Sequence, residues 1–558
     1  MPRCLMRMEP APDRPQRIFP TLVLHFFDRF FDKESLSPQG EPEANVVQML
    51  GILAVPEAFF VLIFRPLTFT GWNLVAVRYL FVSFSMIVMG FLMVFEWDAL
   101  FPDRRDYQVL TPQPLRLSTL FLAKVAALAL FLGMFLVDVN FFGVLLWPGI
   151  DGGSGGITSI LMSHLTAVAV GGLFAAVSIA AVKGVLVTVF RGSWYRRVSV
   201  GVQTLLMAVL VMLLVLTPFT AAGLQWTAEH HPQYLVLFPP YWFAGLYETL
   251  RPATHSEVLR SIGWLAWRGL AVVCAVFLLT YLPGYRGHSR RVLEAPAAGA
   301  SGPGRLRIWI GRAMEATVLR HPVEWAVFRF ITQTITRSMK HRLFLATYGG
   351  FGAAMAVITV ASGKNGWYEL PHMLAFVLIS GLRAAFNFPS ELPANWGFQM
   401  TETSAIGPYL SGTRKWIVMC AVLPLFAVLA PIEVVQFGWA RAALYTTYGI
   451  AVSMVLMEAM FLGFRKVPFT CAHFPGKVNL VFLGVMYIFG FTAYSGLVTR
   501  GELWLQTRPI AAAVFFGLAA IAWAVLTHQG RRMLGAKARL AYDDPADPVV
   551  RTLGIGVR

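Results

Sequence analysis

Apolar runs long enough to cross a lipid bilayer recur through most of this 558-residue chain. Hydrophobic residues make up 57% of the sequence, and charged residues only 13%. A soluble domain needs about one charged residue in four, so this composition excludes a soluble globular protein. The sequence therefore predicts an all-α polytopic membrane protein.

Twelve runs have the roughly 20 apolar residues that a helix needs to span the hydrocarbon core. Six lie in the first half of the chain and six in the second. The first run carries Pro56 and Glu57, and the third and fourth are long enough to tilt or kink. The predicted spans are 46–64, 74–95, 118–147, 158–190, 198–224, 262–282, 343–361, 370–388, 416–437, 442–464, 478–498 and 509–527.

Lysine and arginine set the predicted orientation, because cytoplasmic loops keep positive charge. With both termini inside, most of the 46 basic residues fall on the inner side. Topology then explains the net charge of +17, and we expect no nucleic-acid binding. We expect a multi-pass protein of the cell (inner or plasma) membrane with cytoplasmic N- and C-termini. The basic residues of the outer loops are Arg65, Arg251, Arg260, Lys364, Arg441 and Arg500.

Each half of the chain follows an amphipathic segment. Residues 19–33 place their apolar side chains three and four apart, on one helical face. At about 15 residues this helix is too short to cross, so we expect it in the inner interface; packing on a soluble partner is the alternative. A second such segment, after Pro322, places Trp325, Phe328 and Ile331 on one face.

The order of elements predicts two related six-span units. Each has an amphipathic helix, two spans, an inner loop and four more spans, so an axis along the membrane normal would relate the units. Gly, Ala, Pro and Arg dominate the segment between them, as in a linker. The predicted parts are a cytoplasmic N-terminus with its amphipathic helix (1–45), the first six-span unit (46–283), a cytoplasmic linker (284–319), the second six-span unit with its own amphipathic helix (320–528) and a basic cytoplasmic tail (529–558).

A polar loop lies on the predicted inner side of each unit, between its second and third spans. The loops are 96–124 and 387–415, both contain Phe-Pro, and both end in a basic residue at the mouth of the next span. Their mixed charges suit pairing with a partner, although a solvated connection is the alternative. The candidate coupling residues are Glu96, Asp98, Phe101, Pro102, Asp103, Arg104, Arg105, Asp106, Phe388, Pro389 and Glu391.

The stretch LTPQPLRLSTLFLAK, 110–124, resembles the type-2 ABC exporter permease family. In that family an acidic residue ends the second span, and a Leu-Pro-hydrophobic-Ser stretch leads to a basic residue that opens the third. The second unit lacks the Pro-hydrophobic-Ser core, so it departs from the pattern. The resemblance extends over nearly the whole chain. The matching residues are Glu96, Asp98, Pro112, Pro114, Leu115, Ser118 and Lys124.

The resemblance implies a transmembrane permease subunit of an ATP-driven exporter, which is not itself an enzyme. Its inner loops would touch two separate ATPase subunits, whose ATP-driven dimerisation alternates access for an unidentified substrate. The chain has no GxxxxGK[ST] phosphate-binding loop, so we expect ATP and Mg on the partner, no cofactor on this chain, and membrane lipid around it. Short re-entrant helices close the outer end in that family. Their place here is 225–261, with the outer-gate candidates Pro239, Pro240, Tyr241 and Trp242.

Ionisable residues inside spans are functional candidates, because burying them in lipid costs free energy. Glu57 follows Pro56, and Arg78 on the next span is its predicted partner, as a structural ion pair or as a substrate or proton site. Asp138 and Glu458 have no evident partner in the sequence. The candidates are Glu57, Arg78, Asp138, Lys183 and Glu458.

Two other functions stay open. An ion- or proton-coupled secondary transporter would explain the intramembrane carboxylates, but 103–107 lacks the glycines of the sugar-carrier loop. A membrane-embedded transferase with a lipid-linked substrate needs clustered carboxylates, often with metal, and here Arg104 and Arg105 neutralise the cluster. His230 and His231 lack a third ligand nearby, so we expect no metal site.

Overall fold

The computed structural model describes most of the chain, in twelve stretches, and every regular element among them is a helix. The first predicted span with Glu57, and the inner-loop residues Phe101, Pro102, Asp103, Arg104, Arg105, Asp106 and Glu391, lie outside the described residues. The described residues are 18–31, 74–100, 116–151, 156–190, 192–251, 256–294, 305–363, 366–390, 392–403, 406–471, 480–534 and 540–542.

Within the described residues, nine helical segments are long and apolar enough to cross a membrane. Each coincides with one of the predicted spans, so the chain is a multi-pass helical membrane protein. The eighth and eleventh predicted spans correspond to α16 (Gly366–Ala385) and α21 (Leu480–Leu505). These two helices are 20 and 26 residues long but are not among the nine. Twelve spans therefore stays a prediction.

The chain forms two compact units, residues 1–299 and 300–558. The boundary falls inside the predicted linker, 284–319. Much of this linker is helical, because α12 (Trp264–Glu294) continues past Pro283 and α13 (Arg305–Thr317) follows. The end of α12 after Pro283 contains three Arg, one Leu and one Glu, which are good helix formers.

Unit 1 is built around α3 (Leu74–Phe95), which is almost entirely buried. Three long helices pack against it: α5 (Leu117–Asp151), α6 (Ile157–Val189) and α7 (Gly192–Ala222). α12 in turn packs against α6. A short 3-10 turn, η1 (Asp98–Leu100), follows α3 at the start of the predicted inner loop.

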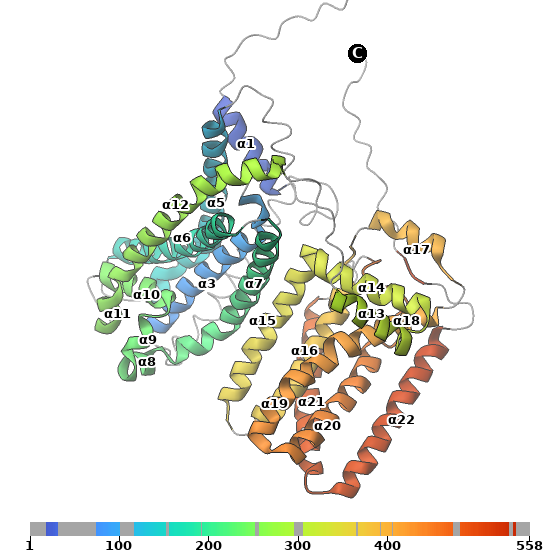
Figure 1. Cartoon of the computed structure of the whole chain (residues 1–558). Helices are drawn as coiled ribbons and strands as arrows, with labels where there is room; N and C mark the ends of the chain where they lie inside the picture. Colours follow the sequence, from blue (N-terminus) through green and yellow to red (C-terminus); the bar gives the residue numbers. More distant parts are fainter. Residues whose placement is uncertain are drawn as a thin grey trace, which may run out of the picture. The chain divides into compact units, whose positions relative to one another are not determined.

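The first predicted amphipathic helix is α1 (Ile18–Phe31), which lies along α5 (Figure 1). Its residues Leu22, Val23 and Phe26 are buried. The ring of Phe30 stacks on that of Phe131 with 4.8 Å between the ring centroids. The apolar face of α1 is thus covered by the protein itself, and its position at the membrane interface stays a prediction.

Four short helices lie at 225–261, the segment where the resemblance implied short helices. They are α8 (Leu224–His230), α9 (Pro232–Leu235), α10 (Pro239–Leu250) and α11 (Glu257–Ile262). α10 is largely buried and packs against α3, α6 and α12. It is therefore part of the core of unit 1.

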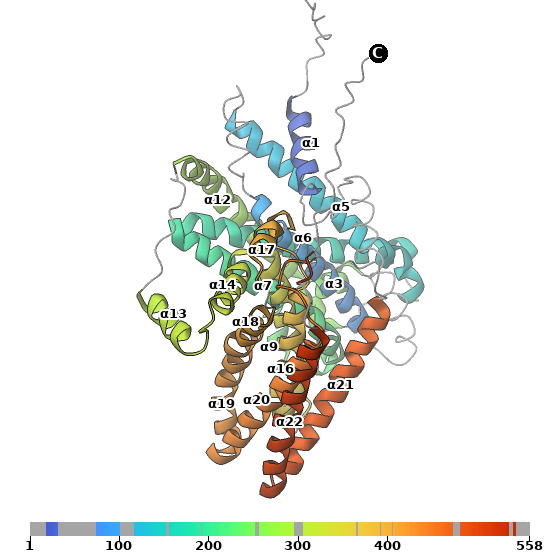
Figure 2. The ribbon, with the colours of Figure 1, turned by 90° about the vertical axis from the view of Figure 1, so that its right-hand side faces the viewer.

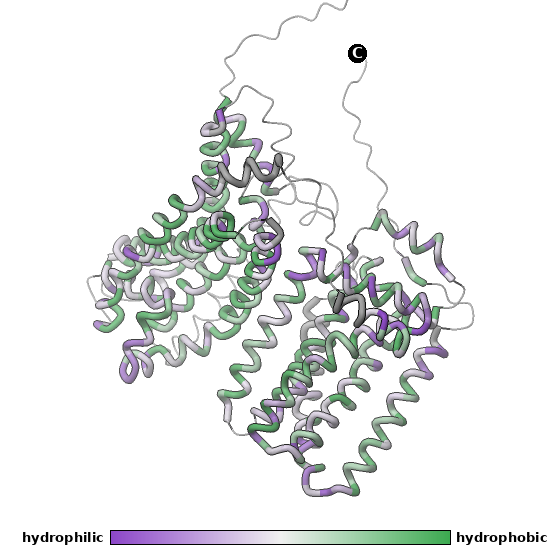
Figure 3. The backbone as a smooth tube through the Cα atoms, in the orientation of Figure 1, coloured by the Kyte–Doolittle hydropathy of each residue, from purple (hydrophilic) through white to green (hydrophobic). Residues whose placement is uncertain are grey.

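Unit 2 is a bundle of long helices with shorter helices gathered at one end (Figure 1). The turned view in Figure 2 shows α19, α20, α21 and α22 running in a similar direction. Figure 3 shows apolar residues along the long helices and polar residues towards their ends. The helices not yet given bounds are α14 (Pro322–Arg337), α15 (Met339–Ala361), α19 (Leu423–Phe437), α20 (Trp439–Met460) and α22 (Pro509–Leu534).

The predicted inner loop of unit 2, 387–415, is largely helical in its described residues. It contains η2 (Leu392–Ala394), α17 (Asn395–Thr401) and α18 (Gly407–Ile417). α18 runs into α19 through a π-helical turn, η3 (Val418–Val422). Pro424 lacks the N–H that would bond the carbonyl four residues earlier, next to this π turn. The ninth predicted span therefore begins earlier than 416, within a helix that starts at Gly407.

The close approach of Gly245 on α10 to the backbone of α11 gives a test of the α10–α11 arrangement. A Cβ on Gly245 would lie 2.3 Å from the carbonyl oxygen of Leu259, which is backbone and cannot rotate away. We expect Gly245→Ala to destabilise unit 1 by about 1–3 kcal/mol, seen as a lower Tm in detergent. Gly201→Ala on α7 has open space around its Cβ and should leave Tm unchanged or raised; an equal fall in both variants would contradict this packing.

Candidate functional site

The start of the inner loop in unit 1 is held by side chains from three helices. The last carbonyls of a helix have no partner within it, and here α6, α7 and α12 each supply a donor. The loop therefore leaves the bundle from a fixed point. The bonds are Gln203 Nε2 to Val94 O at 3.0 Å, Lys183 Nζ to Trp97 O, and Tyr281 OH to Leu100 O.

Trp97 is central to this arrangement and is only 1% exposed. Its indole N–H donates to Ser199 Oγ at 2.9 Å, and the ammonium of Lys183 lies 5.5 Å from the centre of its ring. Lys183, a predicted intramembrane charge, thus bonds the turn that follows α3. Of the two coupling residues described here, Glu96 is buried and Asp98 is exposed, so Asp98 is accessible to a partner.

The inner loop of unit 2 also starts from a fixed point. The carbonyl of Phe388 bonds His341 Nε2 at 3.0 Å, and Pro389 beside it is half-buried. Phe469, which follows α20, donates its N–H to the carbonyl of Phe386 at 3.1 Å. Phe469 has φ of 70°, a left-handed conformation that side chains disfavour. The segment after α20 is therefore held in a strained conformation against the loop.

The end of the same loop is bound to the second amphipathic helix, α14. Lys415 Nζ lies 2.5 Å from Glu324 Oε2, and Trp416 Nε1 donates to Thr332 Oγ1 at 2.9 Å. A Cβ on Gly412 would come 2.8 Å from the carbonyl of Glu324, so glycine allows this close approach. α14 and the loop end must therefore move together.

Arg78 does not have the partner that the sequence suggested. Its two terminal nitrogens bond Glu248 at 2.5 Å and Asp151 at 3.1 Å, and all three side chains are buried. Glu57, the predicted partner, lies outside the described residues. Because its terminal nitrogens are already paired, Arg78 joins α3 to the C-terminal ends of α5 and α10.

Arg251 completes a charge-balanced network in unit 1. It pairs with Asp151 at 2.6 Å, and Tyr247 OH donates to the same carboxylate at 2.7 Å. Two guanidinium groups thus face two carboxylates. Buried charges are tolerated when paired in this way, so the network holds α10 in place. Trp147 Nε1 donates to Tyr247 OH at 3.0 Å.

The predicted outer-gate residues form the first turn of α10. Pro239 and Pro240 begin the helix, where a missing N–H costs nothing. The ring of Tyr241 stacks on Tyr79 at 4.8 Å, and Trp242 Nε1 donates to Val236 O at 2.9 Å. These contacts tie the turn to α3 and to the residues before α10; a gating role stays a prediction.

The other two predicted charges have different surroundings. Glu458 pairs with Arg414 on α18 at 3.1 Å, a partner that the sequence did not reveal. Asp138, on α5, is partly buried and its Oδ2 has no hydrogen-bond partner. Glu458 thus links two helices, whereas Asp138 has no assigned contact.

Unit 2 contains a buried acidic cluster whose contacts sequence reasoning did not reveal. His372 Nε2 lies 3.0 Å from Glu502 Oε2, and Glu433 Oε2 accepts from Thr446 at 2.7 Å. The other carboxylate oxygen of Glu433, Nδ1 of His372 and the hydroxyl of Tyr445 have no partner. The bonded partners of the carboxylates are thus an imidazole and a hydroxyl rather than Arg or Lys.

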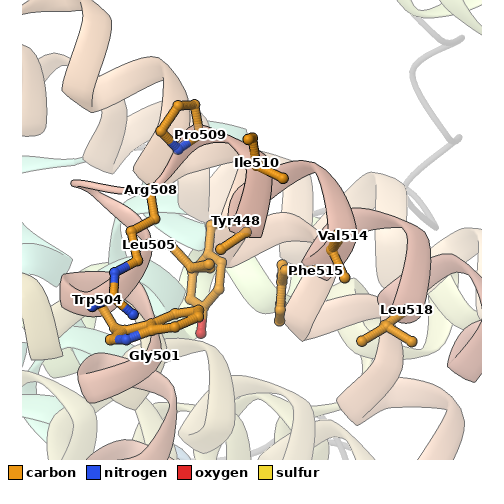
Figure 4. A pocket seen from close by; sticks show the side chains of 11 residues that line it. Tyr448, Gly501, Trp504, Leu505, Arg508, Pro509, Ile510, Val514, Phe515 and Leu518 are labelled. Carbon is orange, nitrogen blue, oxygen red and sulfur yellow. The ribbon is translucent and has the colours of Figure 1, made fainter.

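An apolar cavity of about 800 Å³ lies beside this cluster (Figure 4). Tyr448 lines it and also contacts His372, with the two rings 5.5 Å apart and nearly perpendicular. Arg508 stacks over Trp504 at 4.6 Å. The cavity is therefore lined mainly by apolar side chains, with Arg508 as its one cation. The ring of Tyr448 separates it from the acidic cluster.

Weak signals for the missed residues were present in the sequence. Glu248 and Arg251 are three residues apart, a spacing that puts both on one helical face. Their segment was read as an outer loop, so they were not counted among intramembrane charges. Glu502 was likewise placed in the short connection 499–508, although α21 extends through it.

Comparison with protein-family models, with curated protein sequences and with solved structures gave no match. Among the described residues, no three His, Cys, Asp or Glu side chains are grouped to hold a metal ion. The functional argument therefore depends on the geometry of the chain itself.

The Glu324–Lys415 contact predicts a pH dependence for α14. Burial raises the pKa of Glu324, but hydrogen bonds from Lys415 and Ser411 and the charge of Lys415 outweigh it and hold the pKa below its ordinary 4.5. A lowered carboxyl pKa stabilises the contact above that value, and the effect is lost as pH falls through the folded pKa.

Hydrogen exchange of α14 amides, corrected for intrinsic rates, measures this effect. Protection should fall between about pH 5 and pH 3 in the wild type, and Glu324→Gln should remove that fall. Glu315→Gln, at an exposed position on α13, should keep it. A fall that persists in Glu324→Gln would show that another group is responsible.

Proposed function

We propose that this chain is the transmembrane permease subunit of an ATP-driven exporter whose ATPase is a separate polypeptide. Two pseudo-repeated six-span units in one chain would each present an inner loop to one of two ATPase subunits. The observation that carries the proposal is a common scheme of helix contacts in the two units.

In unit 1, α3 packs against α5, α6 and α7, and α6 packs against α5, α7 and α12. In unit 2, α16 packs against α19, α20 and α21, and α20 packs against α19, α21 and α22. These six contacts correspond when α3, α5, α6, α7 and α12 are matched in order with α16, α19, α20, α21 and α22, and unit 2 adds a contact between α21 and α22. This agreement supports an internal repeat that low sequence identity hides.

A bond between a basic side chain and a backbone carbonyl, present in both units, further supports the correspondence of the helices. In unit 1, Lys183 of α6 bonds the carbonyl of Trp97 after α3. In unit 2, Arg383 of α16 bonds the carbonyl of Met460 in α20 at 3.2 Å. The same pair of matched helices is thus joined by a cation–carbonyl bond, with donor and acceptor exchanged.

Each amphipathic helix contacts the helix that follows the inner loop. In unit 1, Lys124 lies over the ring of Phe26 at 5.6 Å, between α5 and α1. In unit 2, Lys415 pairs with Glu324 of α14. A displacement of either loop would therefore be passed to a helix at its end, as coupling to an ATPase requires.

The resemblance to type-2 ABC exporter permeases agrees with two further features. The short helices α8–α11 precede α12 in the position where that family has re-entrant helices. Unit 2 has only Gln506 to Arg508 between α21 and α22. We infer that the outer gate is built mainly by unit 1, around Pro239, Pro240, Tyr241 and Trp242.

Charge reversal in the first inner loop tests the proposal. Replacing Arg104 and Arg105 with Glu should abolish copurification of the ATPase with the tagged chain, because the loop then repels the surface it pairs with. Arg196→Glu with Arg197→Glu makes the same charge change in the first turns of α7, ahead of the predicted span 198–224, and should leave copurification intact. Unchanged recovery of an ATPase with the first double variant would reject the coupling role of this loop.

A proton-coupled carrier is the second candidate, and the acidic cluster of unit 2 favours it. Two buried carboxylates without a bonded Arg or Lys are costly unless they take up a proton or a cation. Glu502 and His372 are in contact, so a proton has two acceptors there.

Proteoliposomes that contain the chain alone separate the two functions. A carrier would move labelled substrates from a test panel along an imposed proton gradient, and Glu502→Gln would abolish that flux while Glu229→Gln on exposed α8 would not. The permease proposal predicts no gradient-driven flux from the wild type. A protonophore-sensitive flux would overturn it.

A further inference from the structure

A cavity of about 690 Å³ lies at the predicted inner end of unit 2, between α14, α18, α20 and α22. It is distinct from the acidic cluster and takes no part in the contacts assigned to coupling, apart from sharing Lys415 and Glu324. The polarity of its walls is ordered along the helices.

Three walls change from charged to apolar in the same direction. Along one face of α22, Arg531, Thr527 and Trp523 follow at intervals of four residues. About 12 Å of helix separates the guanidinium level from the indole level. On α20, Glu458 gives way to Met454. The charged residues of α20 and α22 therefore lie towards the same end of the cavity.

The third wall is α18, which runs antiparallel to α20 and α22. Its charged residues therefore come before its apolar residues in the sequence. In α18, Arg414 and Lys415 come first, and Val418 and Met419 follow in the π turn. The cavity thus has a charged mouth and a methionine-lined interior. Methionine side chains are flexible and fill irregular space, which suits a bound hydrocarbon chain.

Positive charge exceeds negative charge at the mouth. Lys415 pairs with Glu324, and Arg414 with Glu458. Arg531 is exposed and brings a third cation with no third carboxylate among the cavity's lining residues. Few residues in the span of α22 are buried, so hydrocarbon can reach the cavity from the side.

We propose that this cavity binds one anionic phospholipid of the inner leaflet. Its phosphate lies at Arg531, where Arg offers two parallel donors, and an acyl chain lies over Met419, Met454 and Trp523. Basic pockets between transmembrane helices on the cytoplasmic side are suited to such headgroups. The proposal is independent of the permease function, since it concerns only the surface of unit 2.

Native mass spectrometry of the purified full-length chain tests the site, with phosphatidylglycerol, phosphatidylcholine and inorganic phosphate as probes. The chain should retain phosphatidylglycerol in preference to phosphatidylcholine. Arg531→Gln should weaken retention about fivefold, the effect of one basic residue at a membrane surface. Arg531→Lys should keep most of it. Arg532→Gln removes the next charge on α22, outside the cavity, and should have no effect.

Three results would overturn the proposal. Equal retention of the two lipids would show that the site does not select for negative charge. An equal effect of the Arg531 and Arg532 variants would show that the lipid does not bind at Arg531. Displacement of the lipid by inorganic phosphate would indicate a free-anion site instead. If Arg531→Gln fails to fold, Trp523→Ala removes the chain contact without a charge change, and unchanged retention in that variant would contradict the site.

Discussion

The structure depends on satisfying polar backbone groups where the long helices end. In hydrocarbon every unpaired carbonyl costs several kcal/mol, and a helix leaves its last four carbonyls without a partner. Here Gln203 bonds a carbonyl in the last turn of α3, Lys183 and Tyr281 bond carbonyls in the turn and 3-10 helix that follow it, and Arg383 bonds one at the end of α20. These bonds fix the points from which the inner loops leave the bundle. A loop anchored in this way transmits force to helices instead of bending alone.

The two units use their remaining buried charges differently. In unit 1, Arg78 and Arg251 balance Asp151 and Glu248, so the charges hold α10 against the bundle. In unit 2, Glu433 and Glu502 are bonded by a hydroxyl and an imidazole. A balanced network is a structural contact, whereas an unbalanced one can respond to protons or cations. The two units thus have similar helix contacts but different buried polar groups.

Much of the fold could be predicted because it is encoded locally. Among the described residues, apolar length located the nine helices that are long enough to cross a membrane, and three-and-four spacing located α1 and α14, each of which buries apolar side chains. Pro322 correctly marked the first turn of α14. The helical extension of the ninth span to Gly407 was missed, because Gly407, Pro408 and Ser411 are typical of loops.

The candidate site could be predicted less well, because its contacts join distant parts of the chain. Arg78 was paired with a nearby span, but its partners are 73 and 170 residues away. Glu458 had no evident partner because Arg414 lies in a different helix. Sequence spacing finds neighbours on one helix face, and it cannot find which helices meet. Glu248, Arg251 and Glu502 were missed because their segments were assigned to outer connections between spans.

The central claim is that one chain with two units serves two ATPase subunits. Mass photometry of the tagged chain, purified in mild detergent with ATP and a slowly hydrolysed analogue, measures it directly. The account predicts a complex of one 61.8 kDa chain with two copies of a nucleotide-binding ATPase. A particle that contains the chain alone, or two copies of the chain without an ATPase, would contradict it.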